Sequence, residues 1–159
     1  MTAVKGTNSY VSLAEANAYF DTRLNSDLWT ATDANVKARA LVTTTRMLDE
    51  MPWIGTVVSD TQTLAFPRVC EYFDPKVGSL IYLDGSTVPD RIVRATLELV
   101  YHLLNNDGLL DSSDSVSEIA IGHIKLSGLK SVSKVPSNIR NIIKPLLVNA
   151  GASTWWRAN

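Results

Sequence analysis

The sequence has few of the cysteine and histidine side chains that stabilise many small domains through disulfides or bound metal ions. Its 159 residues include a single cysteine, Cys70, and two histidines, His102 and His123. One cysteine excludes an intramolecular disulfide, and three such side chains do not supply the four ligands of a structural zinc site. We therefore expect the chain to fold around a hydrophobic core, without a metal or another cofactor.

Long apolar runs are also absent. The most apolar segment, 95–104, is interrupted by Thr96, Glu98 and His102, and it is far shorter than the roughly 18 to 20 residues that span a bilayer. The first nine residues have no apolar stretch of the kind found in a secretory signal. A composition of 45% hydrophobic and 19% charged residues is typical of one soluble globular domain. We expect a soluble protein in a reducing compartment, without membrane contact.

Sequence motifs of catalysis are missing as well. There is no nucleophile elbow, phosphate-binding glycine loop, His-Glu-x-x-His pair or calcium loop. Cys70, His102 and His123 belong to no recognisable catalytic motif, and ordinary semi-buried or hydrogen-bonded roles account for them. We therefore predict that the protein is not an enzyme and has no catalytic residues.

The net charge of −1 conceals a division along the chain. Residues 1–114 carry nine basic and fifteen acidic side chains, a net charge of −6, whereas residues 115–159 carry six basic and one acidic, a net charge of +5. Such a division usually concerns partners rather than the fold. We expect an acidic body over 1–114, a linker and β arm over 115–135, and a C-terminal helix and docking tail over 136–159.

Apolar residues at helical spacing predict four helices. The first, over 13–24, follows a capping box formed by Ser12 and Glu15. The second covers 33–50, with Thr30 or Thr32 as its N-cap, and the third, over 90–105, is the most apolar and is expected to be central. The fourth follows Val135-Pro136, and Pro145 is expected to kink it.

The segments between the helices predict little regular structure. Residues 52–89 contain three glycines and scattered prolines, which indicate a long irregular loop with one short strand or helical turn and a turn at Asp84-Gly85. Branched residues in 118–126 predict a strand or hairpin arm, whose candidate contact residues are Ile119, Ile121, Ile124 and Lys125. The predicted fold class is mainly α: a four-helix bundle-like body with a long loop, a β arm, a C-terminal helix and an extended tail.

The C-terminal region combines basic residues with two tryptophans. Its candidate partner-binding residues are Arg140, Lys144, Trp155, Trp156 and Arg157. Exposed tryptophans often anchor a chain on a neighbouring protein, but aromatic stacking with phosphate neutralisation is also how single-stranded DNA is bound. Because most of the basic residues are five or more positions apart, the sequence favours docking on a protein.

Four segments in order resemble a known family. Residues 8–20 read NSYVSLAEANAYF, 62–68 read QTLAFPR, 88–95 read VPDRIVRA, and a proline-interrupted helix covers 135–147. Together they resemble head–tail connector (adaptor or head-completion) proteins of tailed bacteriophages, a group that overlaps with proteins labelled DnaT-like single-stranded-DNA-binding. The chain departs from the pattern where Phe66 replaces the more common tryptophan, where Val69 follows Pro67-Arg68 in place of a glycine, and in its unusual Trp155-Trp156 ending.

The resemblance implies a structural virion protein at the phage neck, made in the host cytoplasm. Such proteins form a ring, usually of twelve copies, that contacts the portal and the tail or neck proteins and continues the channel for genomic double-stranded DNA. The resemblance also implies structural or intersubunit roles for Gln62, Phe66, Pro67 and Arg68. An acidic body suits a channel wall, because like charge prevents DNA from adhering. The alternatives are a DnaT-like single-stranded-DNA-binding protein and a tail terminator or completion protein at the same junction.

Overall fold

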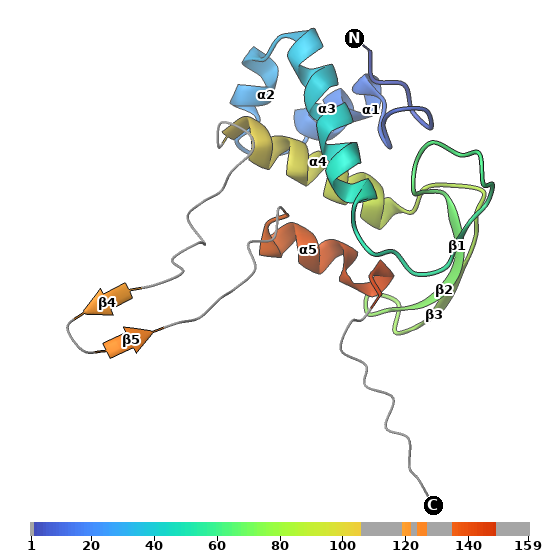
Figure 1. Cartoon of the computed structure of the whole chain (residues 1–159). Helices are drawn as coiled ribbons and strands as arrows, with labels where there is room; N and C mark the ends of the chain where they lie inside the picture. The colour runs from blue at the N-terminus through green and yellow to red at the C-terminus, as the bar shows by residue number, and fades with distance from the viewer. Residues whose placement is uncertain (1, 106–118, 122–123, 127–134, 149–159) are drawn as a thin grey trace, which may run out of the picture.

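The computed structural model describes residues 2–105, 119–121, 124–126 and 135–148 (Figure 1). These residues form five α-helices, one 3₁₀-helix and five strands. In chain order the elements are α1 (Leu13–Asp21), α2 (Asp27–Ala31), α3 (Ala34–Asp49), β1 (Thr56–Val57), β2 (Arg68–Asp74), β3 (Ser79–Asp84), α4 (Asp90–Asn105), β4 (Ile119–Ile121), β5 (Ile124–Leu126), α5 (Ser137–Ile143) and the 3₁₀-helix η2 (Lys144–Leu146).

The prediction of a mainly α, four-helix bundle-like fold was wrong. Strands β1, β2 and β3 form an antiparallel sheet within the segment expected to be irregular, so the fold is mixed α/β. Strand β2 buries Cys70, Tyr72 and Asp74, whereas Phe73 faces outward. An acid on the inner face and an aromatic ring on the outer face disturb the apolar–polar alternation by which a half-buried strand is recognised.

The hairpin turn also lies elsewhere than predicted. Strands β2 and β3 are joined by residues 75–78, whereas Asp84-Gly85 follows β3. An Asp74 carboxylate oxygen accepts from the Lys76 backbone N–H at 2.8 Å, and Gly78 has a φ of +76° that side-chain-bearing residues rarely adopt. The aspartate and the glycine together set this turn.

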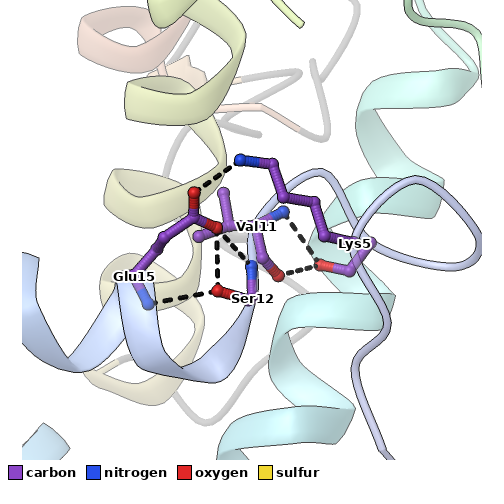
Figure 2. Close-up of polar contacts among 5 residues, drawn as sticks. Lys5, Val11, Ser12 and Glu15 are labelled. Atoms are coloured by element: carbon purple, nitrogen blue, oxygen red, sulfur yellow. Dashed lines mark hydrogen bonds and ion pairs between the residues drawn. The ribbon is translucent and has the colours of Figure 1, made fainter.

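Helix α1 begins as predicted. The Ser12 hydroxyl accepts from the Glu15 backbone N–H at 3.2 Å, and the Glu15 carboxylate accepts from the Ser12 N–H at 2.9 Å (Figure 2), which confirms the capping box. Lys5 pairs with the same carboxylate, and together with the Ser12 backbone it lowers the pKa of Glu15 to about 2. The helix ends earlier than predicted, and Leu24, expected on its buried stripe, is 87% exposed.

Helix α3 has a different N-cap from the two predicted. Asp33 caps it by accepting from the Asn35 N–H at 2.8 Å. The hydroxyls of Thr30 and Thr32 instead bond to carbonyls within the preceding turns, because the short helix α2 occupies 27–31. Five residues are too few to show helical periodicity.

A single hydrophobic core joins the helices and the inner face of the sheet. Helix α4 lies between α3 and α5 (Figure 1) and contacts both. The largest fully buried side chains include Tyr10, Phe20, Leu41, Leu48, Ile92, Leu99, Ile139, Ile143 and Leu146. The C-terminal helix is therefore part of the body's core.

The end of the last helix is joined to the sheet region. Helix α5 stops at Ile143 and continues as η2, since Pro145 lacks the N–H that an α-helix requires. The Ile54 N–H then donates to the Leu146 carbonyl at 3.0 Å, and the Val148 N–H to the Pro52 carbonyl at 2.8 Å. These bonds fix the direction in which the chain leaves the core.

Within the predicted β arm, strands β4 and β5 pair antiparallel. Ile119 lies opposite Leu126, and Ile121 opposite Ile124. This hairpin occupies the segment for which a strand or hairpin was predicted.

Candidate functional site

The outward face of α5 and η2 is polar and carries positive charge. Ser137, Arg140, Asn141 and Lys144 are exposed and lie at positions i, i+3, i+4 and i+7, which places them along one side of the helical segment. The sequence from 135 to 148 contains no carboxylate side chain. Two cations, a hydroxyl and an amide therefore form a surface suited to phosphate groups.

This face is held in place by an ion pair beneath it. The Arg91 guanidinium donates to both carboxylate oxygens of Asp74, at 2.6 and 3.0 Å, and to the Ile142 carbonyl at 3.0 Å. The Tyr72 hydroxyl donates to the same carboxylate at 3.1 Å. The contacts link α4, β2 and α5, and Arg91 holds the pKa of Asp74 well below its usual range. Sequence reasoning missed this pair, which joins residues 17 positions apart.

Two of the predicted partner-binding residues, Arg140 and Lys144, thus share one exposed surface. Trp155, Trp156 and Arg157 lie outside the described residues. Four further candidates, Ile119, Ile121, Ile124 and Lys125, belong to β4 and β5.

The Gln62–Arg68 motif shapes a loop inside the body. The Gln62 amide oxygen accepts from the Val58 N–H at 3.0 Å, and its NH₂ group donates to the Leu64 and Pro67 carbonyls at 2.6 and 3.1 Å. The Gln62 side chain therefore bonds to the backbone near both ends of segment 58–67, which precedes β2.

Phe66 and Arg68 fix the same segment from other directions. Phe66 is buried, lies before a cis peptide bond to Pro67, and packs edge-to-face against Tyr10 and Trp53 with ring centroids 6.1 and 5.0 Å away. Arg68 donates to the Ile54 and Gly55 carbonyls at 2.8 and 2.6 Å. In the structure these motif residues contact their own chain, and their structural or intersubunit role stays a prediction.

Asp49 fixes this loop to helix α3, a role that the sequence did not indicate. Its carboxylate accepts from the Tyr10 hydroxyl and, at 3.1 Å, from the Ala65 N–H. Burial raises the pKa of Asp49 and that of Tyr10. Its two partners, Tyr10 and Ala65, are 39 and 16 positions away in the chain, so no short-range pattern reveals these contacts.

The outer face of the β2–β3 hairpin carries three large, exposed apolar side chains beside the exposed Glu71. Phe73 is 55%, Leu80 63% and Tyr82 67% exposed. The register places Phe73 directly opposite Leu80, and Glu71 opposite Tyr82, so these side chains share one face of the sheet. The sequence suggested no such surface, since the segment was expected to be irregular.

The described residues offer little for covalent or metal chemistry. Cys70 is buried on the inner face of β2, and burial raises the pKa of its thiol, which disfavours the nucleophilic thiolate. Within the described ranges, no three His, Cys, Asp or Glu side chains are grouped to hold a metal ion. No helix in that part of the chain has the length and apolarity needed to cross a membrane.

Comparison with known proteins identifies the family. A family model described as "Putative DnaT-like ssDNA binding protein" matches residues 2–158. The chain belongs to this family. No match was found among curated proteins or among solved structures. Of the two labels that the sequence suggested, the DnaT-like one is therefore supported, whereas nothing found supports the head–tail connector family.

Proposed function

We propose that the protein binds single-stranded DNA through the outward face of α5 and η2. The observation that carries the proposal is the exposure of Arg140 and Lys144, one helical turn apart, on a segment without carboxylates. The family description supports the same nucleic acid. The remaining basic residues of the C-terminal region, with a net charge of +5 over 115–159, extend the positive charge along the chain.

The chemistry of this face supports binding without sequence preference. Arg140 and Lys144 would neutralise phosphates, and the exposed Ser137, Asn138 and Asn141 would donate hydrogen bonds to phosphate or sugar oxygens. These groups recognise the backbone, which is the same for every sequence. The acidic 1–114 region would repel a strand that strayed from the basic surface.

Binding is tested by fluorescence anisotropy with a labelled oligothymidylate over a range of salt concentrations. Each neutralised phosphate contributes about −0.7 to the slope of log K against log salt for single strands. Arg140→Gln and Lys144→Gln should each weaken binding and reduce the magnitude of the slope by about 0.7, and the double variant by about 1.4. Because both side chains are exposed, these substitutions should not disturb the core.

The matched control is Arg39→Gln, which removes an exposed cation from α3. It should leave the salt slope unchanged. Absence of binding at low salt would contradict the proposal, and so would a double variant whose slope equals that of the unmodified protein.

A second candidate is a phage neck protein that assembles as a ring, usually of twelve copies, at the junction of portal and tail. The observation that favours it is the exposed apolar face of Phe73, Leu80 and Tyr82, which suits contact with a protein more than with phosphates. This role includes a connector below the portal and a tail terminator. It predicts that purified protein attaches to isolated portal or tail ends, which electron microscopy would detect; failure to attach to either would contradict it.

A further inference from the structure

Strand β3 is the open edge of the three-stranded sheet. It pairs with β2 on one side, and no other strand in the described part of the chain pairs with its second side. Natural edge strands are commonly protected from association by a charged side chain, a proline or a bulge within the strand. The residues from Ser79 to Leu83 include neither a charge nor a proline, and every one of them pairs in continuous register with β2.

The two large exposed side chains of this edge are apolar in character, and the other exposed residues, Ser79 and Asp84, lie at the two ends of the strand. Leu80 is 63% and Tyr82 67% exposed, and Phe73 on β2 continues the same surface. The charged residue of the strand, Asp84, lies at its end. An apolar strand with unpaired backbone groups on one side is a template for another strand of similar character.

We propose that β3 pairs antiparallel with β3 of a second copy of this chain, about a two-fold axis at Ile81. The inference goes beyond both candidate functions and depends on neither. Residues opposite each other in an antiparallel pair project to the same face. With Ile81 opposite its own counterpart, Leu80 lies opposite Tyr82 of the second copy, so apolar side chains meet at these outward positions, and Asp84 lies opposite Gly78 beyond them.

Other registers that keep the faces aligned fit less well. An axis at Tyr82 would place Leu80 opposite Asp84, and an axis at Leu80 would place Tyr82 opposite Gly78, which has no side chain. The strand is thus self-complementary around Ile81, and it offers no charge with which to recognise an acidic or basic peptide. These two properties favour a second copy as the partner.

The register predicts a specific pattern of cross-linking. In a Cys70→Ala background, Ile81→Cys should form an interchain disulfide under mild oxidation, because opposed Cα atoms lie about 4.5 to 5.5 Å apart. Ser79→Cys is the control, since it would be displaced from its counterpart by four residues, about 14 Å along the strands. Non-reducing electrophoresis distinguishes the two. Cross-linking at both positions alike, or at neither, would overturn the proposed register.

Sedimentation velocity tests the association itself. Edge contacts are small, so weak dimerisation is expected, with the mass approaching twice the 17.4 kDa of the chain as the protein concentration rises. Tyr82→Lys should weaken dimerisation at least tenfold by opposing a charge to Leu80. The control Val77→Lys, 62% exposed in the hairpin turn, should not. A monomer at all concentrations would overturn the proposal, as would association that Tyr82→Lys leaves unchanged.

Discussion

Replacing Arg68 by alanine should destabilise the protein by removing hydrogen bonds to the backbone of the loops beside β2. The guanidinium donates at 2.8 Å to the Ile54 carbonyl, at 2.6 Å to that of Gly55, and at 3.4 Å to that of Ala65. Hydrogen bonds from a charged group contribute about 1.5 to 3 kcal/mol each. The third contact is too long to add much, and the half-buried position gives water some access to the carbonyls.

We therefore expect Arg68→Ala to lower the free energy of unfolding by about 3 kcal/mol, the lower limit for two such bonds. For a chain of this length, 1 kcal/mol corresponds to roughly 2 to 4 °C in melting temperature, so the midpoint should fall by about 6 to 12 °C. Arg68→Lys should lie in between, since an ammonium cannot bond two carbonyls in the fixed geometry of a guanidinium.

Differential scanning calorimetry, together with urea unfolding, provides the measurement. Arg39→Ala on α3 is the control for loss of an exposed cation and should change stability by less than about 0.5 kcal/mol. If Arg68→Ala had the same unfolding midpoint as the unmodified protein, the hydrogen bonds from Arg68 to the Ile54 and Gly55 carbonyls would not stabilise the fold. If the difference in stability between Arg68→Ala and the unmodified protein grew with protein concentration, Arg68 would instead lie at a contact between copies.

Two further perturbations follow from the same region. Gly55 and Gly6 both have positive φ, +74° and +78°, but a Cβ on Gly55 would lie 2.2 Å from the Val69 carbonyl oxygen, whereas one on Gly6 would meet nothing within 4 Å. Because of backbone strain, Gly6→Ala should lower the free energy of unfolding, measured with urea, by about 1 to 2 kcal/mol. Gly55→Ala should lower it clearly more, because the added Cβ also clashes. Equal losses in the two variants would contradict the steric argument. Because Arg91 holds the pKa of Asp74 below the ordinary 3.8, this pair stabilises the fold above that pH, and its contribution disappears as the pH falls toward the depressed value. Asp74→Asn should therefore be less stable at pH 7 and lose less stability between pH 5 and pH 2, and an acid-unfolding profile parallel to that of the unmodified protein would argue against the linkage.

Sequence patterns predicted the features that depend on neighbouring residues. The bounds of α4, Asp90–Asn105, agree with the prediction, because its apolar residues recur over four turns. The capping box needs only Ser12 and Glu15, three positions apart. Arg140 and Lys144 are four positions apart and lie on one side of the last helical segment in the structure. Their role in binding a partner stays a prediction.

The features that the sequence did not reveal depend on tertiary contacts. Asp74 is buried in a strand because Arg91, from a helix formed later in the chain, neutralises it. Phe73 and Tyr82 face outward because the β2–β3 register places both on the outer face of the sheet. Large apolar side chains on an exposed face hide the strand's periodicity, so the segment was predicted to be irregular. Once the apolar outer face and the acidic inner position are known, the sheet follows the ordinary two-residue period.

The bonds between 52–54 and 146–148 have a consequence for the order of folding during synthesis. The residues that complete the core, Ile143, Leu146 and Leu147, follow every other large buried side chain in the chain's described part. Domains generally form from the N-terminus as they are made, and here helix α4 can pack on α3, and strand β2 on β3, before their last packing partners, α5 and η2, emerge from the ribosome. The nascent protein thus exposes the apolar surface that α5 and η2 cover until these two elements are made.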